Sequence, residues 1–153
     1  MALSIGTEAP DFALCFKGDD GIKIARLSDS YGKTNTVLLF FPMAFTSVCS
    51  AEMCDISKGL EEYPNATVYG ISGDSPFSLD AWAKKENIKI PLLSDYDHAV
   101  AKAYDVVYES FLPQLNLIMW EWQNARHSSS IGVVLFDTPK ALTTRETCRI
   151  LKR

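Results

Sequence analysis

Residues 36–41 form a continuous apolar, β-prone run, Thr-Val-Leu-Leu-Phe-Phe, and a proline follows it directly. A run without polar alternation predicts a strand that is buried on both faces. Pro42 has no N–H group to give to a sheet, so we expect the strand to end there. Thr46 and Ser47 are good N-cap residues for a helix. This stretch therefore predicts a buried strand, a short loop and a helix, and it constrains the fold more than any other.

The predicted helix carries Cys49 in its first turn, and we expect it to end before Pro64. Its apolar residues recur at helical spacing and form one stripe: Cys49, Met53, Ile56 and Leu60. The N–H groups and the dipole at a helix N-terminus favour negative charge, so we expect a lowered pKa for Cys49 and more of the nucleophilic thiolate. The alternative is a buried, unreactive cysteine, because free cysteine is among the most buried residue types.

Pro42, Thr46 and Cys49 follow the pattern Pro-x-x-x-Thr-x-x-Cys. This pattern resembles the active-site signature of the peroxiredoxins, the AhpC/TSA family of thiol peroxidases in the thioredoxin superfamily. Cys54 stands five residues after Cys49, as in the bacterioferritin-comigratory (PrxQ) branch. The run Ala-Phe-Thr at 44–46 is more similar to the AhpE-like one-Cys branch. The likeness therefore points to two branches of one family.

The elements on either side of this motif follow the order that the resemblance implies. Residues 6–14, Gly-Thr-Glu-Ala-Pro-Asp-Phe-Ala-Leu, are similar to the family's opening, and the turn residues 18–21 predict a β-hairpin. A second buried strand is expected at 66–72, and a helix begins at Pro76 after a cap by Asp74 or Ser75. We expect its apolar face to hold Phe77, Ala81 and Trp82, with Leu79 to one side.

A short strand near 90–93 and a helix after Asp95 complete this part. Strands that alternate with helices predict an α/β fold whose sheet is covered on both faces. The resemblance implies the thioredoxin-like version of this fold, with a mixed central sheet. The length predicts a single domain over residues 1–153.

The likeness fades from about residue 112. Residues 115–122 are apolar and aromatic and belong either to the core or to a subunit contact, so a homodimer is among the expected assemblies. A strand is expected at 131–137, but the strand that the family places after it is weak or missing here. Residues 143–146, Thr-Thr-Arg-Glu, form a capping-box pattern and predict a short helix to the end of the sequence.

The resemblance assigns roles to the motif residues. Cys49 is the expected nucleophile, Thr46 is expected to hydrogen-bond the thiolate and the peroxide oxygens, and Pro42 is expected to shield the pocket. Backbone N–H groups near Val48 and Cys49 are further expected donors. Cys54 is either the resolving cysteine, which forms a disulfide with Cys49, or a bystander beside an external resolving thiol.

An arginine also belongs to the resemblance, because the family places one six residues before a late aspartate. Its guanidinium holds the thiolate and the peroxide there. Six residues before Asp137 stands Ile131, which cannot do this. The nearest upstream basic residue is Arg126, beside His127, and we predict that Arg126 takes the arginine's place. The alternative is an exposed loop arginine.

Together these roles imply a thiol-dependent peroxidase that reduces hydrogen peroxide or organic hydroperoxides through a cysteine sulfenic acid. The expected partners are the peroxide and a thioredoxin-like or small-thiol reductant. No two cysteines form a Cys-x-x-Cys pair, so a zinc site has little support; the four are Cys15, Cys49, Cys54 and Cys148. We expect no metal and no organic cofactor, because a cysteine residue itself carries the redox change. The alternative is a thioredoxin-fold redox sensor or binding protein with little turnover, which the atypical C-terminal third supports.

Charge and hydropathy narrow the remaining function classes. The net charge of −4 and a pI of about 5.1 argue against binding to nucleic acid or to an anionic membrane. No apolar run approaches the roughly 20 residues that a transmembrane helix needs. The N-terminus lacks the basic and apolar regions of a signal peptide, so we expect a cytoplasmic location, where thiols are kept reduced.

Overall fold

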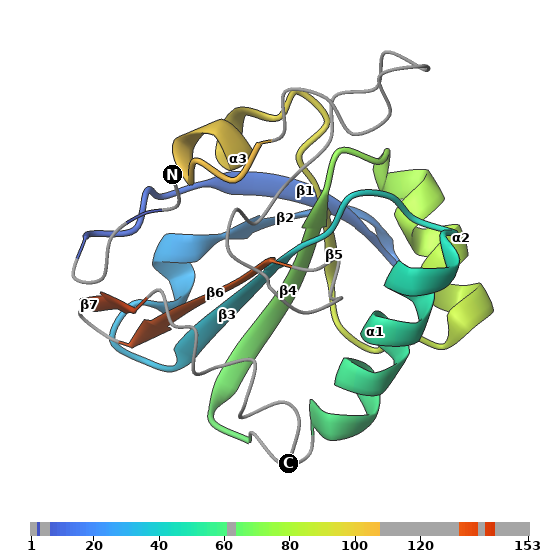
Figure 1. The fold of residues 1–153 in the computed structure, drawn as a ribbon, viewed down its shortest axis with the longest axis horizontal. Coiled ribbons are helices and arrows are strands. Elements are labelled where there is room, and N and C mark those ends of the chain that lie inside the picture. Colours follow the sequence, from blue (N-terminus) through green and yellow to red (C-terminus); the bar gives the residue numbers. More distant parts are fainter. Residues whose placement is uncertain (1–2, 4–6, 61–63, 108–131, 138–139, 143–153) are drawn as a thin grey trace.

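The computed structural model describes residues 3, 7–60, 64–107, 132–137 and 140–142 (Figure 1). These residues contain one seven-stranded sheet, three α-helices and a short 3-10 helix. The strands are β1 (Ala13–Gly18), β2 (Gly21–Arg26), β3 (Asn35–Phe40), β4 (Ala66–Ser72), β5 (Leu92–Ser94), β6 (Gly132–Asp137) and β7 (Lys140–Leu142). The helices are η1 (Leu27–Ser30), α1 (Ser47–Gly59), α2 (Pro76–Glu86) and α3 (Ala99–Ala103).

The sheet is mixed, with the strand order β2-β1-β5-β4-β3-β6-β7. Its centre is parallel, because β3 pairs with β4, and β4 with β5, in the same direction. The outer pairings of β1 with β5 and of β6 with β3 are antiparallel. This is the α/β, thioredoxin-like architecture with a mixed central sheet that the sequence predicted.

The central strand β3 buries side chains on both of its faces, as its apolar run indicates. Val37 and Leu39 pack into one cluster with residues of α1 and α2, whereas Leu38 and Phe40 pack into a second cluster with residues of α3. Figure 1 shows α1 and α2 together on one side of the sheet and α3 on the other. The prediction of helices on both faces is therefore confirmed.

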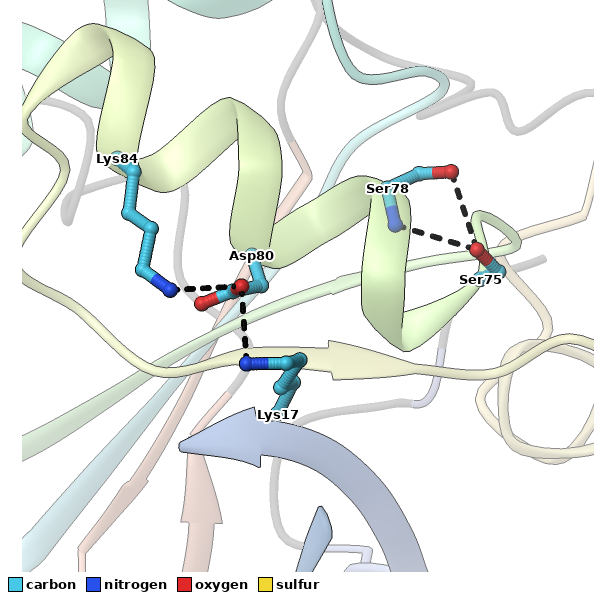
Figure 2. A network of polar contacts seen from close by, with 5 residues as sticks. All are labelled: Lys17, Ser75, Ser78, Asp80 and Lys84. Atoms are coloured by element: carbon cyan, nitrogen blue, oxygen red, sulfur yellow. Dashed lines mark hydrogen bonds and ion pairs between the residues drawn. The ribbon is translucent and has the colours of Figure 1, made fainter. Parts of the chain in front are cut away.

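Helix α2 begins where its capping residues predict. Pro76 is its first residue, and the Ser75 side chain accepts a hydrogen bond of 3.2 Å from the backbone N–H of Ser78 (Figure 2). Leu79 and Trp82 form its buried face. The expectation for Phe77 and Ala81 is wrong, since both are exposed, Phe77 by 62%. Leu79, which lies three residues before Trp82, occupies the buried stripe instead.

A carboxylate of α2 that faces β1 links the helix to the sheet. Asp80 lies 3.3 Å from the Lys17 ammonium on β1 and 2.9 Å from that of Lys84, one turn along α2 (Figure 2). The hydrogen bond from Lys84, followed by that from Lys17, lowers the pKa of Asp80 below its usual range. Exposed ion pairs of this kind contribute little to stability, so packing of Leu79 and Trp82 positions α2.

The part after residue 131 contains one strand more than the sequence predicted. β6 confirms the strand expected at 131–137, apart from residue 131, which lies outside the described residues. The expectation of a weak or missing next strand is wrong, because β7 pairs antiparallel with β6. A three-residue strand is too short to show alternation in a sequence, and the hydrogen bonds of β6 define it.

Several other expectations fall outside the described residues: the helix at 143–153, the segment 115–122 and the full extent of the single domain. In the part that is described, no helix is long and apolar enough to cross a membrane.

Candidate active site

Cys49 is the third residue of α1, so its predicted place in the first turn is confirmed. Thr46 is the N-cap residue with extended backbone angles, and its carbonyl accepts the first bond of the helix, 2.9 Å from the Ser50 nitrogen. The helix ends at Gly59, before Pro64 as expected. The first N–H groups of such a helix have no partner within it, which makes this end electropositive.

The side chain of Cys49 is also a core residue. Only 1% of Cys49 is exposed, and it packs in the cluster that contains Phe41, Met53 and Trp82. The predicted stripe continues with Ile56 and Leu60, which pack against the same cluster: both are partly buried. Burial alone thus fits an unreactive cysteine as well as a catalytic one. The surrounding polar groups must decide between the two.

The loop between β3 and α1 is held by specific hydrogen bonds. The ladder of β3 continues to Phe41, whose N–H donates to the Ile71 carbonyl at 3.0 Å, and it stops at Pro42 as predicted. The Ala44 N–H donates to the Asp74 carboxylate at 2.8 Å. The next residue, Phe45, has a φ of 64°, a left-handed conformation that costs a non-glycine residue about 1–2 kcal/mol. The loop is therefore pinned in a strained shape.

The pKa of Cys49 reflects opposing influences. Burial is the largest and raises the pKa above the ordinary value of a cysteine, while a hydrogen bond with the Thr46 side chain and one from the Met43 backbone lower it. The negative charges of Glu52 and Asp74 raise it further. Among the described residues, these influences together raise the pKa of Cys49, whereas the sequence had predicted a lowered pKa.

The Thr46 hydroxyl has one proton and two acceptors within reach. It donates to the Met43 carbonyl at 3.1 Å, and it also interacts with the Cys49 sulfur. While Cys49 is a neutral thiol, Thr46 can donate to Met43 and accept from the thiol. Once the thiolate forms, a hydrogen bond to the charged sulfur is the stronger one, and rotation of the hydroxyl supplies it. Thr46 can therefore serve both protonation states.

Cys54 lies on a different side of α1 from Cys49, and both thiols are free. Its Sγ atom is 3.4 Å from the Glu86 carbonyl at the end of α2. Its neighbours Ser50 and Ser57 also face α2: Ser50 accepts from the Trp82 indole at 3.0 Å, and Ser57 accepts from the Lys89 N–H at 3.3 Å. This polar face of α1 is packed against α2 and the residues after it. Cys54 is thus half-buried, not an open surface thiol.

The structure brings together Cys49, Thr46 and the loop that starts at Pro42, but it does not test every predicted site residue. Arg126 lies outside the described residues, and so does Cys148. Two groups were missed: the backbone of Met43, which lowers the pKa of Cys49, and the carboxylate of Asp74. A backbone donor leaves no trace in a sequence, and Asp74 carried only a helix-capping pattern.

Comparison with known proteins gives the site its family. The model of the AhpC/TSA family matches residues 5–145. The chain belongs to the AhpC/TSA family. The match includes the whole segment from the opening residues through the Cys49 helix, so the resemblance of the Pro-x-x-x-Thr-x-x-Cys pattern to the peroxiredoxins is confirmed.

Relatives from both expected branches of the peroxiredoxins match this chain. Peroxiredoxin Bcp of Bacillus subtilis is 38% identical over 69% of the chain and 66% of its own length. Alkyl hydroperoxide reductase E of Mycobacterium tuberculosis is 35% identical over 70% of the chain and 71% of its own length. The chloroplastic 2-Cys peroxiredoxin BAS1 of Hordeum vulgare is 36% identical over 67% of the chain. The chain spans only 53% of BAS1.

Among solved structures, a PrxQ mutant of Xylella fastidiosa superposes with a TM-score of 0.77. The alignment covers 99% of this chain and 95% of that one, at 24% identity, and it supports the peroxiredoxin fold. In the described part of the chain, no group of three or more His, Cys, Asp or Glu side chains could hold a metal ion.

The Thr46 hydroxyl is expected to control how readily Cys49 ionises. In Thr46→Val the hydrogen bond to the sulfur is lost, so the pKa of Cys49 rises further. We expect the rate of Cys49 alkylation by iodoacetamide at pH 7.5 to fall at least about fivefold, because a hydrogen bond to a charged group is worth about 1.5–3 kcal/mol. Peptide mass spectrometry across a pH series measures this rate at Cys49 alone.

Thr46→Ser is the matched control, because it keeps the hydroxyl and removes only a methyl group. Its alkylation profile should stay close to that of the wild type. Identical profiles for the valine and wild-type proteins would show that Thr46 does not contact the thiolate.

Proposed function

We propose that this protein is a thiol-dependent peroxidase that reduces hydrogen peroxide or organic hydroperoxides. The observation that carries the proposal is the placement of Cys49 in the first turn of α1, beside the Thr46 hydroxyl and the Met43 backbone, in a chain of the AhpC/TSA family. Both of these polar groups lower the pKa of the buried thiol, as a nucleophilic cysteine requires.

The proposed reaction begins with the Cys49 thiolate. The sulfur attacks the distal oxygen of the hydroperoxide, the O–O bond breaks, and Cys49 becomes a sulfenic acid. The remaining oxygen leaves as an alkoxide or hydroxide and takes up a proton to give an alcohol or water. Charge develops on this oxygen, so a donor aimed at it lowers the barrier. The Thr46 hydroxyl is the proposed donor, and Pro42 is proposed to shield the sulfur from bulk water.

The sulfenic acid needs two electrons from thiols to return to the starting state. Cys54 or an external thiol attacks the sulfenic sulfur, releases water and forms a disulfide. Two reductant thiols reduce a Cys49–Cys54 disulfide, whereas one further thiol reduces a mixed disulfide of Cys49 with an external thiol; in both cases the reductant leaves as its own disulfide. We propose a thioredoxin-like protein or a small thiol as the reductant. Two matched proteins are named for this chemistry: thioredoxin peroxidase I of Plasmodium yoelii and alkyl hydroperoxide reductase E. A reducing compartment such as the cytoplasm fits this cycle.

A redox sensor is the second candidate, and the burial of Cys49 favours it. A cysteine that is 1% exposed, with a pKa raised by burial, forms little thiolate at neutral pH. Such a cysteine reacts with peroxide slowly and suits single oxidation more than rapid turnover. Peroxide consumption in the presence of excess reductant separates the candidates: an enzyme consumes many equivalents per Cys49, a sensor about one.

Replacement of Cys49 tests the enzyme directly. In Cys49→Ser we expect peroxide consumption to fall at least about a hundredfold, because a serine hydroxyl is a far weaker nucleophile than a thiolate at neutral pH. The far-UV circular dichroism spectrum should not change, since serine is close to cysteine in size. Cys15→Ser, which alters a half-buried cysteine on β1, is the control and should keep full activity. Substantial activity in Cys49→Ser would rule out the assignment.

The spacing of Cys49 and Cys54 makes a second prediction. Five residues on a helix advance ~7.5 Å and turn ~500°, so the two sulfurs point apart and lie beyond disulfide reach. A bridge therefore requires the start of α1 to unwind, which breaks the bonds of Ser50 to Trp82 and of Cys54 to Glu86. We propose that oxidation gives this Cys49–Cys54 disulfide with local melting of α1.

Mass spectrometry of peroxide-treated protein, digested without reductant, is expected to show the peptide pair linked through Cys49 and Cys54. In Cys54→Ser the same treatment should leave sulfenic or sulfinic Cys49, because no internal thiol resolves it. Cys15→Ser is the control and should still form the bridge. Wild-type protein that yields only sulfenic or sulfinic Cys49 would make Cys54 a bystander and give resolution to an external thiol.

The proposal for Arg126 follows from the charges around Cys49. Glu52 and Asp74 both raise its pKa, so a guanidinium at the sulfur would offset them. If Arg126 supplies it, Arg126→Ala should slow Cys49 oxidation by peroxide by about tenfold or more and raise the pKa of Cys49. Arg26→Ala is the control, because Arg26 is exposed at the end of β2 and is not among the groups that shift the pKa of Cys49, so it should change neither. Unchanged rate and pH profile in Arg126→Ala would exclude Arg126.

A further inference from the structure

Asp74 joins the end of β4 to the loop that covers Cys49. One carboxylate oxygen accepts the Ala44 N–H at 2.8 Å and the Ser72 hydroxyl at 2.9 Å. Ala44 is buried, and thirty positions of sequence separate it from Asp74. This contact therefore ties the short loop before α1 to a rigid part of the sheet.

The backbone of Asp74 is fixed as firmly as its side chain. Its N–H donates to the Ser72 hydroxyl at 3.1 Å, and its carbonyl accepts from the Ser94 hydroxyl at 2.7 Å. Ser72 and Ser94 are both buried and end the neighbouring parallel strands β4 and β5. On the other side, a side chain at Gly73 would collide with the imidazole of His98. The carboxylate is thus aimed at Ala44 by groups of three different segments.

The residues on either side of Ala44 are those that shape the site. Met43 precedes it, and its backbone is one of the two groups that lower the pKa of Cys49. Phe45 follows it in the left-handed conformation, which a phenylalanine adopts only where its surroundings impose it. Because Ala44 lies between them, the bond from its N–H to Asp74 fixes both neighbours. The Thr46 hydroxyl, bonded to the Met43 carbonyl at 3.1 Å, shares the same loop.

The charge of Asp74 acts in the opposite sense to its hydrogen bonds. Its negative charge raises the pKa of Cys49 and so disfavours the reactive thiolate. An acidic residue near a nucleophilic cysteine is unfavourable unless it also stabilises the structure of the site. The hydrogen bond from the Ala44 N–H to Asp74 is such a stabilising contact.

We propose that Asp74 is a positioning residue for peroxide reduction at Cys49, acting through the Ala44 N–H on the donors of the loop. The inference rests on the proposed peroxidase function. Asp74 touches neither substrate nor sulfur in this role. It keeps Met43 and Thr46 where they meet the sulfur, and the protein tolerates its charge in exchange for a fixed loop.

The two effects separate in a pair of variants with equal net charge. Asp74→Asn loses the negative charge but keeps an amide oxygen that can accept from Ala44 and Ser72. Asp74→Ala loses the charge and the acceptor together. Any difference between the two variants therefore reports the hydrogen bonds and not the charge.

The rate of Cys49 oxidation by hydrogen peroxide, followed across a pH series, gives the pKa of Cys49 and the limiting rate of its thiolate. We expect a lower pKa in Asp74→Asn than in the wild type, with a limiting rate within about threefold. In Asp74→Ala the limiting rate should fall about tenfold or more below that of Asp74→Asn, because the donors are no longer held. Its pKa should be higher than that of Asp74→Asn.

Asp80→Asn is the matched control. It also removes a carboxylate with two polar partners, Lys17 and Lys84, but Asp80 is not among the groups that shift the pKa of Cys49. Both its pKa and its limiting rate should equal those of the wild type. Identical pH profiles for Asp74→Ala and Asp74→Asn would overturn the proposal. Asp74→Asn with a limiting rate as low as that of Asp74→Ala would overturn it as well.

Asp74→Glu keeps the proposal testable if the alanine variant does not fold. It retains the charge and moves the carboxylate by one methylene, so a slower limiting rate is expected and a wild-type rate would contradict the positioning role. The pH profile of alkylation by iodoacetamide gives the pKa of Cys49 without any peroxide. If wild-type Cys49 reacts with peroxide no faster than Cys15, the peroxidase function fails, yet alkylation still shows whether Asp74 holds the loop.

Discussion

Cys49 is both a residue of the core cluster that contains Leu39 of β3 and the third residue of α1. These two environments have opposite effects on the ionisation of its thiol. The core favours a neutral thiol, because the removal of water destabilises a charged sulfur. The helix N-terminus and the loop donors favour the thiolate. Burial raises the pKa of Cys49 more than Thr46 and Met43 lower it. The geometry of the loop therefore matters, because any displacement of these two groups would raise the pKa further.

Three hydrogen bonds hold α1 against α2 and the segment after it. The polar side of α1 faces α2 through Ser50, Cys54 and Ser57, each bonded to a group of α2 or of the segment after it. These bonds keep the start of α1 wound while the thiol is reduced. Each is a single hydrogen bond with a net worth of about 0.5–1.5 kcal/mol, so local opening of the helix is within reach of a chemical change at Cys49.

Local sequence patterns predicted most of the elements, whereas the contacts between distant residues could not be predicted. The run at 36–41 and Pro42 predict β3 and its end, and the structure confirms both; Thr46 is the N-cap residue of α1 as predicted, but its side chain makes no capping hydrogen bond. The hydrogen bond from Ala44 to Asp74 joins residues thirty positions apart. It depends on the pairing of β3 with β4, which no local pattern specifies. The exposure of Phe77 has the same cause, because packing on the sheet selects which of several apolar residues on α2 is buried.

The charged groups that act on Cys49 in the described part of the chain are acidic. Two acidic groups, Glu52 and Asp74, act on the sulfur, and no cation of the described residues is among the groups that lower its pKa. The ammonium of Lys85 is held over the ring of Phe45, 5.6 Å from its centre, at the edge of the same loop. Opposite charges attract most strongly where water is excluded, so a buried sulfur on which two carboxylates act provides a favourable place for a guanidinium. The reactivity of Cys49 therefore depends on whether a residue outside the described part brings a positive charge there.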